Sequence, residues 1–436
     1  MFEKLDAFLH NIPTIETQKI AGKLVKVVGL LLESNGPACT LGELCIVKNK
    51  YENKDVCIAE VVGFKNDHVL LMAIGSVEGI GPGSEILATG TKHQVKVSDA
   101  ILGRVVNGLG EPIDGKGDIF AHTTYDVNTN APNPLTRKKI ETPIYTGVKV
   151  IDGVLTVGMG QRVGIFAGSG VGKSTTLGMI ARNSSADINI IALIGERGRE
   201  VTEFIERDLG EEALQRSVVV VATSDLDALI RVKCAFVATS IAEYFRDQGK
   251  NVLLMMDSVT RMCMAQREIG LTIGEPPTTK GYPPSVFSLM PKLMERSGNN
   301  DKGYITALYT VLVEGDDMNE PIADTARGIL DGHIVLDRRL AAEGHYPAID
   351  ALESVSRLMK DIVEPSHLKA AKKLLELYAT YKESEDLINI GAYKSGSNPK
   401  IDEALEKYNA ILQFLRQSVD ESLTYSETIN LLLETV

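Results

Sequence analysis

A run of closely spaced glycines followed by lysine and serine has the clearest chemistry in this sequence of 436 residues. Backbone N–H groups in such a loop can turn toward one anion, the lysine ammonium adds charge for the outer phosphates of a nucleotide, and the serine hydroxyl can bind Mg²⁺. The strict motif begins with glycine; Ala167 stands there and still allows close backbone approach. The predicted phosphate-binding residues are Gly168, Ser169, Gly170, Val171, Gly172, Lys173, Ser174 and Thr175.

A second candidate is Asp257, which ends the apolar run at residues 251–257. A carboxylate at this place can hold Mg²⁺ or its water shell near the β- and γ-phosphates. An aspartate at the end of a strand is also common as a helix cap. The phosphate-binding loop upstream favours the metal role, so Ser174 and Asp257 are the predicted metal residues.

The third candidate is Glu196, which follows the apolar run at residues 188–194. A carboxylate near the γ-phosphate can orient and polarise the attacking water. The alternative is that Glu196 forms surface ion pairs with Arg197 or Arg199. Spacing alone leaves both interpretations open.

The elements around these residues predict an α/β domain. Residues 162–166, 188–194, 217–223 and 251–257 are continuous apolar runs, which are typical of strands covered on both faces, as in a parallel sheet between helices. Residues 174–181 read as the beginning of a helix. Ligands of such sheets bind beyond the carboxyl ends of the strands, where the candidate residues lie.

The flanking regions have different patterns. From about residue 20 to residue 91, short β-rich runs separated by turns predict a small closed β-barrel. Near the C-terminus, apolar residues at helical spacing predict a helical domain. They are Leu374, Leu375, Tyr378 and Tyr381, followed by Leu405, Tyr408, Ile411, Leu412 and Leu415. The predicted parts are residues 1–18, 19–91, 92–356 (the nucleotide domain with its leading connector) and 357–436.

Residues 1–18 are predicted to form a short amphipathic segment. Apolar residues at helical spacing precede Pro13: Phe2, Leu5, Phe8, Leu9 and Ile12. Such a helix could pack on its own domain, or it could dock on a partner or a membrane surface.

Composition narrows the class of protein. No apolar run reaches the roughly 18 residues of a membrane span, and the first residues lack the apolar core of a secretory signal, so a cytoplasmic protein is expected. The five cysteines lack the close pairs of a metal site and are expected to be free thiols. A net charge of −12 argues against nonspecific binding to nucleic acid.

Several longer segments, taken together, resemble the ATPase of type III protein export, a family similar to the catalytic subunits of rotary ATP synthases. The likeness covers nearly the whole chain from about residue 20, and Asn319 resembles the flagellar branch more than the virulence-injectisome branch. The segments that carry it are residues 195–200, 256–268, 274–287, 314–324 and 345–350.

This resemblance implies roles for individual residues. Glu196 matches the catalytic glutamate of the family, Lys173 and Ser174 match the phosphate lysine and the magnesium hydroxyl, and Asp257 matches the Walker B acid. Arg357 matches the arginine finger that a neighbouring subunit supplies to the γ-phosphate.

The resemblance also implies an adenine pocket. Tyr346 matches the aromatic residue that stacks on adenine in the related synthases, with core packing at the strand end as the alternative. Tyr393 matches more loosely and would form the other side of the pocket.

The expected architecture is a RecA-like P-loop nucleotide-binding domain with an N-terminal β-barrel and a C-terminal helical domain. The expected reaction is Mg²⁺-dependent hydrolysis of ATP by a homohexamer that serves the export of flagellar proteins. Expected partners are a regulator or stator protein, a stalk protein, export chaperones, their substrates and the membrane export gate. This places the protein at the cytoplasmic face of the inner membrane.

Other functions remain as alternatives. A virulence injectisome ATPase shares all of these motifs, and the catalytic subunit of a rotary ATP synthase or ion pump shares the loop and the glutamate. A hexameric RNA translocase needs a surface for base stacking, which a chain with 5% aromatic residues and no Trp offers poorly. A nucleotide-binding regulator without activity would lack a water-activating acid, and Glu196 argues against it.

Overall fold

The structure is a computed structural model that describes residues 20–49, 55–313, 315 and 317–436. The chain divides into two compact units. The first contains the described residues up to Gln94 together with Ile269–Glu275, and the second contains Val95–Glu268 and Pro276–Val436. The predicted amphipathic segment, residues 1–18, lies outside the described residues.

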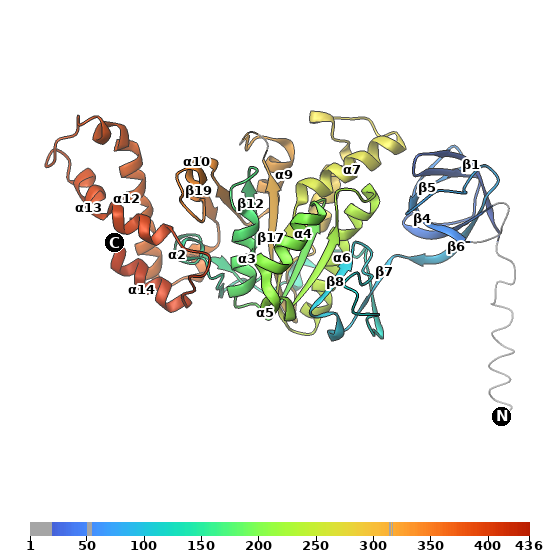
Figure 1. Cartoon of the computed structure of the whole chain (residues 1–436), viewed down its shortest axis with the longest axis horizontal. Helices are drawn as coiled ribbons and strands as arrows, with labels where there is room; N and C mark the ends of the chain where they lie inside the picture. Colours follow the sequence, from blue (N-terminus) through green and yellow to red (C-terminus); the bar gives the residue numbers. More distant parts are fainter. Residues whose placement is uncertain (1–19, 50–54, 314, 316) are drawn as a thin grey trace, which may run out of the picture. The chain divides into compact units, whose positions relative to one another are not determined.

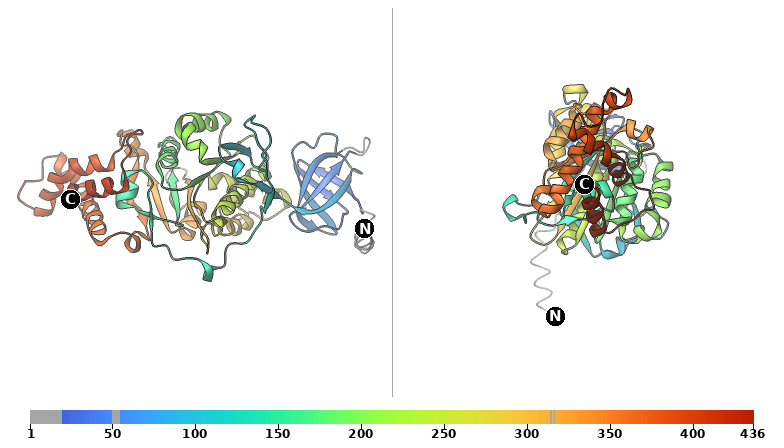
Figure 2. Two further views of the ribbon diagram at one scale, coloured as in Figure 1. Left: turned by 90° about the horizontal axis from the view of Figure 1, so that it is seen from below. Right: turned by 90° about the vertical axis from the view of Figure 1, so that its left-hand side faces the viewer.

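The first unit contains a closed β-barrel, as the alternating sequence pattern predicts. Its strands follow the order β1-β2-β5-β4-β3-β6 around the barrel, and the left view of Figure 2 shows them in blue. In β3, every second side chain is buried, and the barrel core includes Leu32, Val47, Leu71 and Ile86. The strands are β1 (Gly22–Val28), β2 (Leu31–Ser34), β3 (Glu43–Lys48), β4 (Asp55–Lys65), β5 (His68–Ile74) and β6 (Glu85–Lys92).

The second unit is built on a sheet whose strand order is β19-β18-β12-β17-β15-β13-β14-β8. The strands from β18 to β8 pair in parallel, whereas β19 runs antiparallel to β18 and β16 antiparallel to β17. Their bounds are β8 (Arg104–Asn107), β12 (Arg162–Ala167), β13 (Ile188–Ile194), β14 (Ser217–Ala222), β15 (Asn251–Asp257), β16 (Gly298–Asn299), β17 (Tyr304–Leu312), β18 (Gly332–Leu336) and β19 (Ile349–Ser356). This arrangement confirms the predicted α/β fold class.

Helices cover the sheet (Figure 1). They are α3 (Lys173–Asn183), α4 (Gly198–Glu203), η4 (Phe204–Leu209), α5 (Gly210–Gln215), α6 (Ala228–Asp247), α7 (Val259–Ile273), α8 (Pro284–Met294), α9 (Pro321–Ile329) and α10 (Arg338–Ala342). Short elements complete the connections: β7 (Gln94–Val97), β9 (Thr123–Asp126), β10 (Pro143–Ile144), β11 (Val157–Gly158), η2 (Asp99–Ile101), η3 (Pro134–Thr136) and η5 (Thr279–Gly281).

The C-terminal part of the second unit is helical. It comprises α11 (Met359–Ile362), α12 (Pro365–Asn389), α13 (Pro399–Leu415) and α14 (Tyr425–Thr435), which gather near α2 (Lys149–Val154) in Figure 1. The predicted apolar stripes meet between α12 and α13, where the rings of Tyr381 and Tyr408 stack with their centroids 3.5 Å apart. Leu374 and Ile411 are fully buried in the same core as the sheet.

The candidate site residues lie at the carboxyl ends of the parallel strands. The carboxyl ends of β12, β13 and β15 point the same way because the strands between them are parallel. The phosphate-binding loop follows β12, Glu196 follows β13, and Asp257 is the last residue of β15. The predicted candidates therefore converge on a single edge.

Candidate active site

The loop between β12 and α3 forms one wall of a cavity of about 680 Å³. Gly170 and Gly172 have φ values of 78° and 83°, a left-handed conformation that disfavours any residue with a side chain. Helix α3 begins directly after them at Lys173, so its first N–H groups face the cavity that the loop lines. All the predicted phosphate-binding residues, Gly168 to Thr175, line this cavity.

Lys173 connects the two candidate acids. Its ammonium forms an ion pair with Asp257 and lies 3.6 Å from Oε1 of Glu196. Asp257 is buried, and its Oδ1 accepts a hydrogen bond of 2.8 Å from the Thr310 hydroxyl on β17. Four strand ends thus hold one lysine and two carboxylates within a few ångströms of each other.

The carboxyl of Glu196 has an unusual protonation equilibrium. Burial raises the pKa of Glu196 to about 7, and the negative charge of Asp257 acts in the same direction. The positive charge of Lys173 opposes this rise. A hydrogen bond to Glu200 also raises the pKa of Glu196 and lowers that of Glu200. A carboxyl with a pKa near neutrality can take up and release a proton under physiological conditions.

The alternative interpretation, in which Glu196 forms ion pairs with Arg197 or Arg199, does not hold. Arg197 pairs with Glu200 at 2.7 Å, and Arg199 pairs with Glu203 at 3.3 Å. The guanidinium that approaches Glu196 belongs instead to Arg261 of α7, with 3.5 Å between its Nε and Oε1 of Glu196. The side chains of Arg197 and Arg199 are 77% and 84% exposed, and Arg197 also lines the cavity.

Arg261 and Glu200 were not identified from the sequence. Arg261 lies in the first turn of α7, which begins two residues after Asp257. Glu200 lies in the first turn of α4, which begins two residues after Glu196. Gly195 makes the approach of Arg261 possible: its φ is 69°, and a Cβ there would lie 2.8 Å from Cδ of Arg261.

Tyr346 lies beside the phosphate-binding loop. Its ring is 3.6 Å from the point where a Cβ on Gly172 would stand, and the residue is 47% exposed. Its carbonyl oxygen accepts a 2.9 Å hydrogen bond from the backbone of Gln417. Tyr346 also lines a second cavity of about 700 Å³ together with Gln413 and Arg416. The sequence did not indicate that the end of α13 borders this cavity.

Tyr393 does not lie beside Tyr346 or the phosphate-binding loop. It belongs to the loop between α12 and α13, away from α3 (Figure 1). Its hydroxyl lies 2.9 Å from Oδ1 of Asp402, to which it donates a hydrogen bond. The described residues that line the two cavities do not include Tyr393.

Arg357 lies near the amino end of β18, whereas the phosphate-binding loop of its own chain follows the carboxyl end of the neighbouring β12. Leu336, at the carboxyl end of β18, is next to Ala167 on β12 and Ile349 on β19. Because β19 is antiparallel, Ser356 at its end is opposite Gly332, at the amino end of β18. Arg357 follows Ser356 and is exposed, so its own loop is a full strand length away.

The matches to family models agree with this architecture. The ATP synthase alpha/beta family matches residues 147–356 by its nucleotide-binding domain and residues 24–90 by its β-barrel domain. The C-terminal domain of the type III secretion ATPase EscN matches residues 363–434. The fold and the site define a P-loop ATPase of the ATP synthase alpha/beta class.

Individual relatives narrow the class. The chain is 56% identical to the flagellum-specific ATP synthase of Bacillus subtilis (strain 168), over 98% of this chain and 97% of that one. It is 50% identical to the type 3 secretion system ATPase of Xanthomonas euvesicatoria, over 97% and 96% of the two chains.

A solved structure of a type III secretion ATPase has a similar fold. The assembled ATPase EscN of the enteropathogenic E. coli type III secretion system has a TM-score of 0.90 and 47% identity, over 95% of this chain and 99% of that one. The chain belongs to the family of flagellum-specific and type III secretion ATPases, which are ATP-hydrolysing enzymes. This confirms the resemblance found in the sequence.

Proposed function

We propose that this chain hydrolyses ATP in a ring of identical subunits and that the reaction serves the export of flagellar proteins. The observation that carries the proposal is that Lys173 pairs with both Asp257 and Glu196, beside a cavity that is lined by the phosphate-binding loop and Glu196. Phosphoryl transfer to water requires phosphate binding, charge neutralisation and an oriented water, and these residues offer one group for each task.

The loop and Lys173 bind the phosphates of ATP. Backbone N–H groups at the start of α3 point at the β- and γ-phosphates, and the lysine ammonium adds a full charge there. Lys173 now pairs with Asp257, so phosphate oxygens would compete with that carboxylate for the ammonium. The free enzyme thus holds Lys173 at the cavity beside the loop.

Mg²⁺ fits the oxygen groups beside the loop. Ser174 offers a hydroxyl in the first turn of α3, and Asp257 offers a buried carboxylate oriented by Thr310. Mg²⁺ is usually held by one or two protein oxygens together with substrate phosphates and water, and this pair meets that need. When bound, the ion neutralises charge that develops on the phosphates.

Glu196 acts on the attacking water. Its carboxylate accepts a hydrogen bond from the water and takes its proton as the bond to phosphorus forms. Lys173 and Arg261 both place a positive charge within 3.6 Å of Oε1 of Glu196, which favours the position in which this carboxylate lines the cavity. The pKa of about 7 leaves a large share of Glu196 ionised at neutral pH.

Arg357 completes the site of a neighbouring subunit. It is exposed and follows Ser356, which is opposite the amino end of β18, whereas its own loop follows the carboxyl end of the neighbouring β12; this supports a role outside its own site. A guanidinium supplied in trans stabilises transition-state charge and requires an assembly. A head-to-tail contact would place the amino ends of the parallel strands of one copy toward the carboxyl ends of those of the next copy. Repetition of this contact generates a ring, and we propose six copies.

Tyr346 binds the adenine. Its exposed ring beside Gly172 provides a stacking surface next to the phosphate site. The other wall is formed by Gln413 and Arg416 at the end of α13, which offer hydrogen-bonding groups to the base. This assignment replaces Tyr393 on the far side of the pocket.

The biological setting is flagellar export. Export ATPases of the flagellar and the virulence type both occur among the relatives, and the flagellar type includes the match at 56% identity. A related structure contains EscN with its central stalk EscO, which supports a stalk partner here. A stator or regulator protein, chaperones with their substrates, and the membrane gate are the further partners, with the ring at the cytoplasmic face of the membrane.

We propose three domains: a barrel at residues 19–91, a nucleotide domain at 92–356 and a helical domain at 357–436.

Among the described residues, the helices are too short or too polar to cross a membrane.

The decisive experiment combines activity with export. Phosphate release from ATP is measured against protein concentration, and flagellar protein secretion is measured in a strain whose native copy is replaced by wild type or by Glu196→Gln. We expect activity to rise steeply with concentration and secretion to fall in the variant. Normal secretion from cells that hold only inactive enzyme, or hydrolysis without secretion of flagellar proteins by wild type, would exclude the flagellar role.

A further inference from the structure

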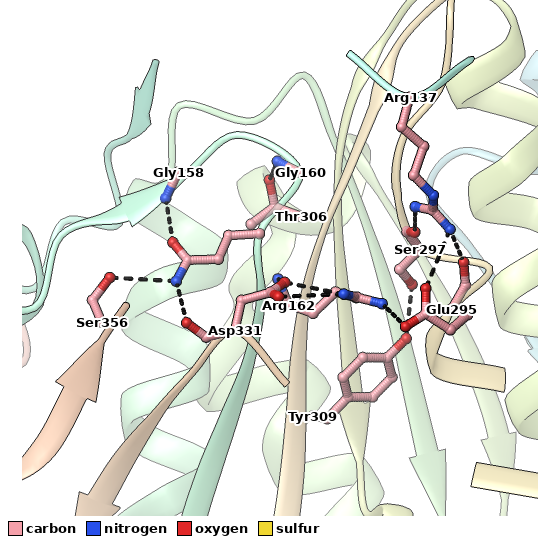
Figure 3. Close-up of polar contacts among 11 residues, drawn as sticks. Arg137, Gly158, Gly160, Arg162, Glu295, Ser297, Thr306, Tyr309, Asp331 and Ser356 are labelled. Atoms are coloured by element: carbon pink, nitrogen blue, oxygen red, sulfur yellow. Dashed lines mark hydrogen bonds and ion pairs between the residues drawn. The ribbon is translucent and has the colours of Figure 1, made fainter. Parts of the chain in front are cut away.

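A chain of polar side chains runs along the amino-terminal edge of the sheet (Figure 3). One member of this chain is Gln161, which comes directly before β12 and is fully buried. Its Oε1 accepts a 2.8 Å hydrogen bond from the backbone N–H of Gly158. Its Nε2 donates to the carbonyl of Asp331 at 3.1 Å and to the Ser356 hydroxyl at 3.3 Å. The whole amide is therefore engaged.

The two groups that accept hydrogen bonds from Nε2 of Gln161 also fix the backbone at Arg357. The carbonyl oxygen of Asp331 also accepts the backbone N–H of Arg357 at 3.2 Å. Ser356 is the residue before Arg357, and its hydroxyl donates a 2.7 Å hydrogen bond to the carbonyl of Thr156. One buried amide thus fixes the last residue of β19 and the peptide group from which the Arg357 side chain begins.

Asp331 is itself fixed by Arg162. The guanidinium Nε and the backbone N–H of Arg162 donate to Oδ2 of Asp331 at 3.0 and 3.1 Å, and the Asp331 N–H donates back to the Arg162 carbonyl at 2.8 Å. Arg162 pairs further with Glu295 at 2.5 Å, and Glu295 pairs with Arg137 at 3.5 Å. The support for Arg357 therefore extends across the sheet edge to the end of α8 (Figure 3).

The packing at this point leaves little room for movement. A Cβ on Gly332 would lie 2.7 Å from the Val355 carbonyl oxygen and 3.3 Å from Nε2 of Gln161. Strands β18 and β19 therefore approach each other closely where the amide sits. The guanidinium of Arg357, in contrast, has one described hydrogen bond, of 3.2 Å, to the Arg327 carbonyl at the surface.

We infer that Gln161 is a positioning residue for Arg357 and, through it, acts on hydrolysis in the neighbouring subunit. The inference rests on the proposed action of Arg357 in trans. An arginine that must meet a transition state on another chain needs a fixed starting point, because displacement by about 1 Å can lower a rate by roughly a hundredfold. Gln161 supplies that fixed point without touching a nucleotide.

Two variants test the inference, Gln161→Met and Ser356→Ala. Methionine keeps the length and volume of the buried side chain and removes its hydrogen bonds; alanine at position 356 removes a hydroxyl from a half-buried place and is the milder change. We expect kcat of the assembled enzyme to fall roughly tenfold to a hundredfold with little change in ATP affinity. Thermal unfolding measures how much of each variant is folded.

The control is Ser354→Ala, the same substitution two residues earlier in the same strand. The Ser354 hydroxyl donates to the Asp350 carbonyl and accepts the Val335 N–H at 2.9 Å. It supports the pairing of β18 with β19 away from Gln161. Ser354→Ala should leave kcat within about twofold of wild type. A loss as large as that of Ser356→Ala would mean that any weakening of β19 has this effect, and would overturn the inference.

A mixing experiment separates the inference from the proposed function. Copies with Arg357→Ala are mixed with copies with Lys173→Ala, which do not hydrolyse ATP but carry Arg357. Rescue of activity supports a finger in trans, and no rescue at the expected assembly contradicts the proposed function itself. The Lys173→Ala copies are then given Gln161→Met or Ser356→Ala as well. Loss of rescue supports positioning by Gln161, whereas rescue equal to that by Lys173→Ala alone overturns it.

Discussion

The Nζ atom of Lys173 lies 3.6 Å from Oε1 of Glu196, although Lys173 begins the helix after β12 and Glu196 follows β13, with β17 and β15 between these two strands in the sheet. The ammonium charge reaches the carboxyl that is proposed to take the proton of water. The same lysine pairs with Asp257. Phosphate binding and water activation are thus electrostatically linked before a nucleotide arrives.

Glu196→Gln should abolish turnover and keep the affinity for ATP. The amide has nearly the same shape, so phosphate binding by the loop persists, but it cannot accept the proton of water. We expect kcat to fall at least a hundredfold, measured by phosphate release, with ATP binding followed by calorimetry. Glu200→Gln is the matched control and should retain most activity. Hydrolysis near the wild-type rate in Glu196→Gln would assign the water to another residue.

The pH dependence of kcat/KM should report the ionisation of Glu196. The base acts as a carboxylate, and its pKa is raised to about 7, so kcat/KM rises with pH through that region. The Glu200 hydrogen bond contributes to the rise of this pKa, and its removal in Glu200→Gln should move the profile toward lower pH. Glu203→Gln, which alters a solvent-exposed pair with Arg199, should leave the profile in place. A shift toward higher pH in Glu200→Gln would contradict this electrostatic account.

Arg357→Ala should separate nucleotide binding from turnover. The side chain is remote from the loop of its own chain, so monomers should bind ATP with unchanged affinity. Turnover by the assembled enzyme should fall by about a thousandfold or more, the range found for arginine fingers supplied in trans. The measurement is ATP hydrolysis at protein concentrations above and below assembly. An equal fractional loss at concentrations where only monomers exist would argue for a role within one subunit.

Tyr346→Ala should weaken the binding of ATP. Stacking of a base on an aromatic ring contributes about 1–3 kcal/mol, so the Kd should increase roughly fivefold to 150-fold. Inorganic triphosphate, which has no base, should bind the variant and the wild type equally. Tyr393→Ala is the control, because the Tyr393 hydroxyl is bonded to Asp402 in another loop. An equal loss of affinity in both variants would remove the assignment of the adenine to Tyr346.

Gly195→Ala should destabilise the enzyme and disturb its site. The left-handed backbone at Gly195 disfavours a side chain by about 1–2 kcal/mol, and the added methyl group would displace Arg261, which lies 2.8 Å from the added Cβ. We expect this loss in the free energy of unfolding by urea titration, together with a lower kcat. At Gly198, an added Cβ meets no described atom within 4 Å, so Gly198→Ala should change stability by less than about 0.5 kcal/mol. Equal stability of the two variants would contradict the argument.

Sequence patterns predicted the architecture because the pattern of apolar residues along a strand or helix reflects which of its faces are buried. The runs at residues 188–194 and 251–257 became buried parallel strands, and the glycine-rich loop was recognisable from local chemistry alone. The placement of Glu196 and Asp257 at one edge followed from the general geometry of parallel sheets.

Partners across the sheet could not be predicted in the same way. The approach of Arg261 to Glu196 depends on the order of β15 and β13 in the sheet and on the space above Gly195. The role of Gln161 depends on β18, which pairs with β12, and on β19, which pairs with β18, and the sequence positions of these strands give no indication of either pairing. Tyr393 was predicted from a loose match, and its loop between α12 and α13 contributes no described residue to the lining of either cavity described above.

The antiparallel direction of β19 has a genetic consequence. With Arg357 acting in trans, a subunit that lacks it keeps an intact pocket of its own and disables the pocket of its neighbour. In a cell that makes both forms, defective copies enter the same rings as normal ones and silence sites that carry no mutation. Alleles that damage this edge of the sheet should therefore be dominant over wild type, whereas alleles that prevent assembly should be recessive.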